Sequence, residues 1–384
     1  PEQAGHEIVS YFNFKTEDGE SILIKFALSA VSTNNAIENL NAEISHWDFE
    51  KIKLQAKQKW NDELSKITIE TDVERKVNFY TSMYHSFMNP IIYNDVNGEY
   101  RGLDQNIYKA EGFTNYTIFS LWDTYRALHP LYTIIQQQRT NDIVNSMLAH
   151  YDQSVHKILP IWSHYSNENW CMIGYHAVPV IVDAYMKGLR EYDTNKAFDA
   201  VLSSSNYELY DGIGYYKKYG FVPEDLNSNS ASKTLEYAYD DWTIYKFAES
   251  IGEKKIADEY FKRAQSYKNL FDPVTKFIRA KNSDGKFKEP FDALSTANQG
   301  YIEGNAWNYS LYVPHDVKGF INLLGGKEKL ITWIDSLFTM HISDESFAHS
   351  EDVDRAGMIG NYVHGNEPSH QVPYMYCYAG EPWK

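Results

Sequence analysis

The stretch SKTLEYAYDDWTIYKFAESIG, residues 232–252, decides the fold because it predicts one long helix that ends at a glycine. Gly252 suits the position just past a helix end, where the backbone often turns left-handed. A second helical pattern follows at once over residues 253–272. Its large apolar side chains share one face: Ile256, Tyr260, Phe261, Ala264, Tyr267 and Phe271. A connection this short makes the two helices antiparallel neighbours.

Similar helical patterns fill most of the chain on both sides of this pair. They cover residues 73–87, 140–151, 173–190, 317–324, 327–338 and 368–378, and a kink is expected at Pro179. No strand-rich stretch interrupts them after Asp72. The pattern predicts a mainly α fold, and we favour an α/α toroid over residues 67–384, with an inner ring of helices inside an outer one. An irregular helical bundle is the alternative.

The first 66 residues differ from the rest. Residues 8–14 and 21–32 alternate around an Asp18-Gly19 turn, which predicts two strands. Because two strands do not form a stable sheet alone, we interpret residues 1–33 as the last strands of a β-sandwich domain. The polar helical pattern of residues 34–66 predicts a linker to the toroid.

Composition narrows the function. The formal net charge of −16 argues against a nucleic-acid surface, which needs clustered Lys and Arg, and is compatible with calcium. No apolar run reaches the roughly 20 residues that span a bilayer, and no signal peptide is visible. The 31 tyrosines favour a polar ligand with apolar faces, such as a sugar. The only two cysteines, Cys171 and Cys377, leave a single disulfide open.

One carboxylate stands out in QGYIEGNAWNY, residues 299–309, because Glu303 lies between Gly300 and Gly304. A nearby aromatic ring, Trp307, would disfavour the charged form of that carboxylate, as a general acid requires. The alternative is a capping role for Glu303 at a helix that starts near Asn305.

Other polar clusters occur where loops meet helices. The first is Ser120–Arg126, in which Asp123 has capping-box spacing from Ser120 and Trp122 and Arg126 could form a pocket wall. The others contain Glu168, Trp170, Cys171 and His176; Glu236, Asp240 and Asp241; and His364, Asn366 and Glu367. In a toroid such junctions meet at one end. Paired carboxylates and aromatic rings there indicate glycoside chemistry, whereas the spacing of Cys171, His164 and His176 fits no standard zinc site.

Five windows resemble family 92 of the glycoside hydrolases, which are calcium-dependent, inverting exo-α-mannosidases. They are SLWDTYR at 120–126, WCMIGYH at 170–176, TLEYAYDDW at 234–242, EGNAW at 303–307 and GNEPSH at 365–370. The resemblance implies a β-sandwich, a helical linker and an (α/α)6 toroid. It implies hydrolysis of terminal α-mannosides of N-glycans or mannans, with α-1,2-type linkage, by a secreted or periplasmic protein.

The resemblance also implies residue roles. Glu303 becomes the general acid, Asp123 a mannose ligand, and Asn366 and Glu367 ligands of Ca²⁺. Further substrate-binding residues are Trp122, Arg126, Glu168, Trp170, Cys171, His176, Trp307 and His364. Loops 207–230 and 343–355 would set linkage preference.

The general base of the family lies on a motif that would follow Lys384, so this chain alone is expected to turn over little substrate. Two alternatives stay open at this point. One is another toroidal carbohydrate-active enzyme, a different glycosidase or a lyase, and the other is a non-catalytic glycan-binding protein.

Overall fold

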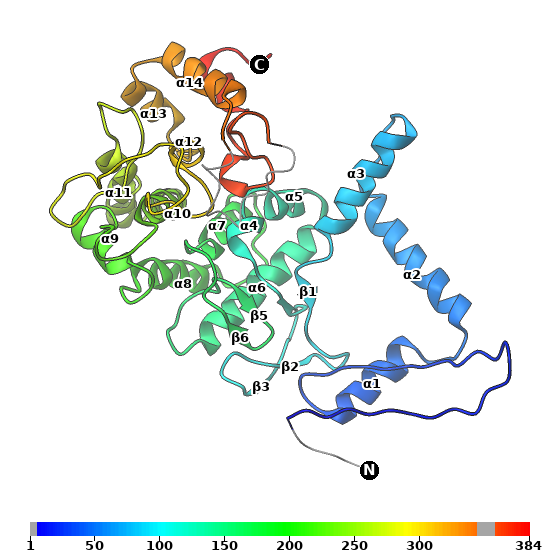
Figure 1. Ribbon diagram of the computed structural model, residues 1–384. Helices are drawn as coiled ribbons and strands as arrows, with labels where there is room; N and C mark the ends of the chain where they lie inside the picture. The colour runs from blue at the N-terminus through cyan, green and yellow to red at the C-terminus, as the bar shows by residue number, and fades with distance from the viewer. Residues whose placement is uncertain (1–5, 344–357) are drawn as a thin grey trace.

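The computed structural model describes residues 6–343 and 358–384, and most of their regular structure is helical (Figure 1). The mainly α prediction is therefore confirmed. Three small antiparallel strand pairs lie between the helices: β1 Ile91–Ile92 with β4 Tyr116–Thr117, β2 Glu99–Arg101 with β3 Ile107–Lys109, and β5 Ser163–His164 with β6 Asn167–Glu168.

The helices follow one another along the chain, with these strands between them in sequence. The first three are α1 Thr33–Glu43, α2 Phe49–Leu64 and α3 Val73–Ser86, and they extend to one side of the others in Figure 1. The helices of the main body are α4 Leu121–Thr124, α5 Leu128–Ile135, α6 Gln137–Gln153, α7 Ala177–Met186, α8 Thr194–Asn206, α9 Ile213–Tyr219, α10 Ser230–Ile251, α11 Lys254–Arg263, α12 Ala306–Tyr309, α13 Val317–Leu324, α14 Lys327–Thr339 and α15 Met375–Ala379. The described residues also contain the 3-10 helices η1 Ser266–Leu270 and η3 Glu367–Ser369.

Helix α10 is the central element of the body. Gly252 ends it with φ +82°, and α11 begins two residues later, so the helix pair inferred from the sequence is present. α10 also packs on α7 and α8. Because it is covered on all sides, it buries polar side chains such as Glu236 and Asp241 as completely as Leu235 and Phe247.

The tyrosine excess has a structural origin. Many tyrosines are fully buried, and most of their hydroxyl groups find polar partners in the core, as burial of this side chain favours. Tyr132 donates to the Ser86 carbonyl at 2.7 Å, Tyr237 to the Asp211 carbonyl at 2.7 Å, and Tyr267 to Asp316 at 2.8 Å. High tyrosine content was therefore a weaker sign of a sugar ligand than the sequence indicated.

The N-terminal prediction of paired strands is wrong for residues 6–32. The Asp18-Gly19 turn forms, with Gly19 at φ +81°, but the segments on either side have no strand hydrogen bonds. Side chains such as Tyr11 and Phe12 are 82% and 78% exposed, so no third layer buries a sheet face and stabilises the pairing. Residues 34–66 are helical as predicted, and α1 is tied to the body through Asn35 and Asp95.

A smaller correction concerns Pro179. It lies in the first turn of α7, where a missing N–H leaves no hydrogen bond unmade, so the helix has no reason to kink there. The helix begins at Ala177 and not at 173, because Gly174 with φ +88° directs the chain into it. Within residues 6–343 and 358–384, no helix is both long and apolar enough to cross a bilayer.

Candidate active site

The N-terminal half of α10 holds three loops that are distant in sequence. The Ser232 hydroxyl accepts a hydrogen bond from the Ile302 amide at 3.1 Å, next to Glu303. One residue on, the Lys233 ammonium donates to Asp211 at 2.6 Å. One turn further, Glu236 accepts from Arg126 at 2.9 Å. The helix thus fixes the Glu303 loop, the 207–212 loop and the α4 segment at one end of its axis.

The Glu303 loop has a strained backbone that its glycines permit. Gly300 has φ +88°, and a Cβ there would lie 2.5 Å from the Cβ of Ala280, so no other residue fits. Glu303 itself has φ +50°, a left-handed conformation that few non-glycine residues adopt. Strain of this kind is common at functional sites.

Asn305, and not Glu303, is the N-cap of α12. Its side-chain oxygen accepts hydrogen bonds from the Trp307 and Asn308 main-chain amides at 3.0 and 3.3 Å. In return, the Asn308 side-chain oxygen accepts from the Asn305 main-chain amide at 3.1 Å. The alternative that Glu303 caps this helix is therefore wrong. The Glu303 side chain itself is half-buried.

The 361–367 segment packs directly against the Glu303 loop. The Asn366 amide donates to the Glu303 carbonyl, and Asn308 donates to the Asn361 carbonyl at 2.7 Å. The Asn366 side-chain oxygen accepts from the Glu367 amide at 3.1 Å and so begins η3. Two segments about sixty residues apart in sequence form one polar surface here.

Asp123 on α4 faces Glu367. Burial, and after it the negative charge of the neighbouring Glu367 carboxylate, raise the pKa of Asp123 to about 7. The Ser120 hydroxyl and the Arg126 charge act in the opposite direction. Two carboxyl groups in contact require a proton or a cation between them at neutral pH.

The oxygens of this surface suit a calcium ion. Asp123 and Glu367 supply carboxylate oxygens and Asn366 an amide oxygen, which are the hard ligands that Ca²⁺ prefers. In the part of the chain that the structure describes, no three His, Cys, Asp or Glu side chains converge on one point. Amide and main-chain oxygens or water would therefore have to complete the shell.

A buried charge cluster lies behind this surface and is here named the Glu236 cluster: Arg126, His176, Glu236 and Asp240. Arg126 is held by Glu236, by the Trp122 carbonyl at 2.9 Å, and by stacking on the rings of Trp122, Tyr125 and Tyr312 at 4.8–4.9 Å. His176 contacts Asp240 at 2.8 Å and Glu236 at 3.5 Å, and burial lowers its pKa to about 3. Arg126 Nη1 and His176 Nε2 are buried without a hydrogen-bond partner among the described residues.

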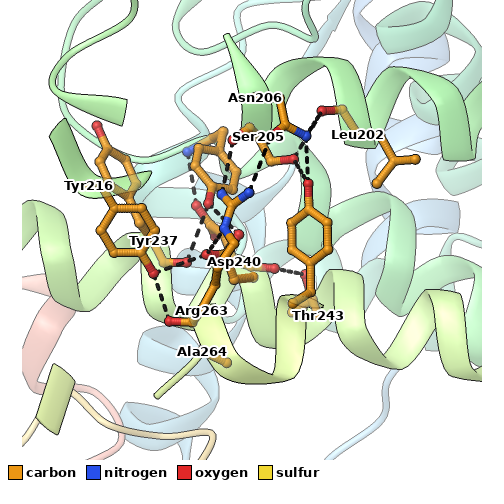
Figure 2. A network of polar contacts seen from close by, with 12 residues as sticks. Leu202, Ser205, Asn206, Tyr216, Tyr237, Asp240, Thr243, Arg263 and Ala264 are labelled. Atoms are coloured by element: carbon orange, nitrogen blue, oxygen red, sulfur yellow. Dashed lines mark hydrogen bonds and ion pairs between the residues drawn. The ribbon is translucent and has the colours of Figure 1, made fainter. Parts of the chain in front are cut away.

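A second cluster, the Asp241 cluster, lies on the neighbouring face of α10 and comprises Tyr175, Tyr216, Asp241 and Arg263. Figure 2 labels two of its members, Tyr216 and Arg263. Asp241 accepts from Tyr175 at 2.7 Å, Tyr216 at 3.0 Å and Arg263 Nε at 2.9 Å. The other guanidinium nitrogens of Arg263 donate to Asn206 and to the Ser205 carbonyl on α8. Asp240 and Asp241 point to different faces, as adjacent helical positions must.

The remaining residues singled out in the sequence lie in different surroundings. Glu168 accepts three main-chain amides, from Ile161, Trp162 and Trp170, at 2.8–3.1 Å, so it braces its own loop. The Trp307 ring packs against Phe277 and Trp333 in the aromatic core.

His364 lines a cavity of about 460 Å³ with residues that include Tyr125, Arg126, Tyr239 and Tyr312. Cys171 and Cys377 are exposed free thiols, so the disulfide left open by the sequence is absent. The structure thus brings Asp123, Asn366 and Glu367 together with the Glu303 loop, whereas His176 is fully buried and Trp307 is partly buried against the aromatic core.

Three residues that hold these loops in place were not found from the sequence: Asp211, Lys233 and Asn361. Lys233 could have been found from the sequence, because polar residues occur on every side of the predicted helix that contains it. Such a pattern is unusual unless the helix is buried and its polar groups are paired.

Comparisons with known proteins follow this geometry. The sequence model of the "Glycosyl hydrolase family 92 catalytic domain" matches residues 35–384. A family GH92 α-mannosidase from Bacteroides thetaiotaomicron has 46% identity and a TM-score of 0.87, over 92% of this chain and 47% of its own. Its complex with mannoimidazole gives a TM-score of 0.88 at 45% identity, over 92% of this chain and 47% of that one.

Two further relatives are more distant. A family GH92 inverting mannosidase from the same species is 32% identical, with a TM-score of 0.82, over 92% of this chain and 50% of its own. An "Uncharacterized secreted glycosidase" of the fungus Arthroderma benhamiae is 25% identical over 93% of this chain and 45% of its own length. The chain therefore spans about half the length of the relatives it matches.

Proposed function

Because the chain belongs to glycosyl hydrolase family 92, we propose that it acts as an exo-α-mannosidase on terminal α-mannosides of N-glycans or mannans, with α-1,2-type linkage. One observation carries the proposal. The Glu303 loop, the Asp123 segment and Asn366-Glu367 are distant in sequence, yet they form one polar surface at the N-terminal end of α10. The mannoimidazole complex of the 45% identical relative supports a mannose-shaped ligand.

Glu303 is the proposed general acid. The left-handed backbone of Glu303 is fixed by two hydrogen bonds: the Ile302 amide donates to Ser232, and the Asn366 side chain donates to the Glu303 carbonyl. These bonds hold the carboxyl at a constant position. Protonation of the leaving glycosidic oxygen by such a group contributes roughly 10²–10⁴-fold to the rate. Inversion also requires a second carboxylate, about 6.5–9.5 Å away, to activate water. We assign only the acid to the described residues.

Asp123, Asn366 and Glu367 are the proposed holders of Ca²⁺. When bound, the ion would bind sugar hydroxyl groups, and its positive charge would favour a distorted sugar ring. Asp123 also accepts a hydrogen bond from a mannose hydroxyl in this proposal, and Arg126 holds the α4 segment in place through the Trp122 carbonyl. By analogy with the secreted fungal relative, we propose a secreted or periplasmic location.

The test is hydrolysis of α-1,2-mannobiose by the natural-length protein in calcium, followed by proton NMR of the anomeric signals. β-Mannose should appear first, as inversion requires. Glu303→Gln should slow hydrolysis about 10²–10⁴-fold and leave disaccharide affinity within roughly 3-fold. The exposed Glu259→Gln on α11 is the matched control and should keep the wild-type rate. Wild-type hydrolysis by Glu303→Gln would show that the acid is misassigned, and an unsaturated product would identify a lyase.

A further inference from the structure

A second cavity, of about 410 Å³, lies beside the 162–176 loop and is lined by His156, Trp170, Tyr207, Leu209, Tyr210 and Asp211. The three segments that form it come from the ends of α6, β6 and α8. None of these side chains belongs to the polar surface of Glu303, Asp123 and Glu367. The cavity is therefore separate from the proposed catalytic site.

The Trp170 indole is held in a fixed orientation at this cavity. Its main-chain amide donates to Glu168 at 3.1 Å, and its backbone has φ +55°. The ring packs edge to face against His156, with 5.7 Å between the ring centroids. It also packs against Tyr210, with 5.4 Å between the centroids, and Tyr210 is itself buried. The indole nevertheless stays 38% exposed. A large flat apolar surface is thus presented to solvent at no further cost in side-chain ordering.

Polar groups surround the ring. The Tyr207 hydroxyl is hydrogen-bonded to His156 Nδ1 at 2.7 Å, which fixes both side chains. One Asp211 oxygen binds Lys233 at 2.6 Å, and the other makes no hydrogen bond within residues 6–343 and 358–384. That free carboxylate oxygen is an acceptor for a ligand hydroxyl group. Since no Lys or Arg is among the described residues that line the cavity, and Lys233 is already paired with Asp211, the cavity suits a neutral polyol better than an anion.

A pyranose ring has the matching chemistry. Its C–H face packs on an indole, and its hydroxyl edge donates to a carboxylate. The position in the fold supports the same ligand. Lys233, which holds Asp211, directly follows Ser232, which holds the Glu303 loop, so the cavity segment and the Glu303 loop are anchored at adjacent residues of α10.

We infer that this cavity binds a hexose residue of the glycan other than the one that is cleaved. The identity of that glycan rests on the proposed mannosidase function. Trp170 supplies the stacking surface and Asp211 the hydroxyl acceptor. The cavity thereby favours oligosaccharides over single mannosides, and the 207–211 segment becomes a determinant of which glycan is bound.

The test compares calorimetric affinities for α-1,2-mannotriose and for mannoimidazole, a single-ring ligand, in calcium. Trp170→Ala should weaken mannotriose binding roughly 2- to 10-fold, the range of one aromatic contact, and leave mannoimidazole binding unchanged. Trp170→Phe keeps a ring and should stay within about 2-fold of the wild type. Trp47→Ala is the matched control, because Trp47 is also exposed and cavity-lining but belongs to the α1–α2 connection.

The outcomes separate the two proposals. Equal mannotriose affinity for wild type and Trp170→Ala overturns the inference, as does a loss in Trp170→Ala that is matched by Trp170→Phe or by Trp47→Ala. If mannoimidazole binds but mannotriose binds no more tightly, the cavity inference fails and the mannosidase proposal survives. If mannotriose binding depends on Trp170 while mannoimidazole does not bind at all, the cavity takes a sugar and the mannosidase proposal fails. Absence of binding by either ligand at millimolar concentration contradicts both.

Discussion

The Glu236 cluster and the Asp241 cluster are two buried arginine–carboxylate groups on neighbouring faces of one helix, and they differ in how completely they are satisfied. Asp241 accepts three hydrogen bonds, and all three nitrogens of Arg263 donate. In the Glu236 cluster, Arg126 Nη1 and His176 Nε2 have no hydrogen-bond partner among the described residues. Buried unsatisfied groups are rare where structure alone is at stake. The difference indicates that the Asp241 cluster joins helices, whereas the Glu236 cluster serves the loops of the candidate site.

The largest expected effect is on the Asp241 cluster. Asp241→Ala leaves the Arg263 guanidinium buried without its carboxylate, and loss of one partner of a buried pair costs about 3–5 kcal/mol. Urea unfolding measures this loss. The folded fraction should bind mannoimidazole as the wild type does, because the cluster contacts none of the proposed ligand-binding residues. Weakened binding by folded Asp241→Ala would break the comparison.

Glu236→Gln should cost less stability than Asp241→Ala but should weaken ligand binding. The amide still accepts from Arg126 but without charge, so the expected loss of stability is about 1.5–3 kcal/mol. Arg126 also holds the Trp122 carbonyl, so α4 and Asp123 lose part of their support. Mannoimidazole affinity should fall roughly 10-fold, the lower limit for loss of a supporting contact at a metal site. Unchanged affinity would assign the Glu236 cluster to structure alone.

His129 is buried outside both clusters, so it shows the effect of burial on a pKa without the effect of a charged partner. Burial alone lowers the pKa of His129 to about 4, against 6.5 when exposed. The unfolded chain therefore binds the proton first, so this contribution to stability is lost as pH falls below 6.5 and levels off near 4. Between pH 7.5 and 5.0 the wild type should lose about 2 kcal/mol more than His129→Leu. Urea unfolding of both proteins at the two pH values measures the difference, and equal losses would show that His129 is protonated in the fold.

Helical periodicity predicted the fold well where a helix has its own start and stop signals. The α10–α11 pair, with Gly252 between its members, is the clearest case, and α13 and α14 also match. Periodicity failed for residues 8–32, since alternation reports only a suitable pattern and not the neighbouring layer that a strand needs. Loop 343–355, expected to influence linkage, lies almost wholly outside the described residues.

The site was predicted in part. Residue type identified Asp123, Glu303 and Glu367, because carboxylates beside glycines and helix starts stand out locally. The contact between the Asn366 side chain and the Glu303 carbonyl could not be predicted, because it joins segments about sixty residues apart in sequence. Likewise the contacts of the partly buried Trp307 ring with Phe277 and Trp333 did not follow from the sequence. Local sequence does not say which face of a short helix is buried.

The calcium dependence of mannoimidazole affinity tests the central claim most directly, since it requires the Glu303 loop, Asp123 and Asn366-Glu367 to form one site. Calorimetry in calcium and in chelator gives the ratio. We predict binding at least roughly 10-fold tighter with calcium, and a much smaller ratio in Glu367→Ala, because one carboxylate ligand is then missing. Equal affinity in calcium and in chelator for the wild type would contradict the account.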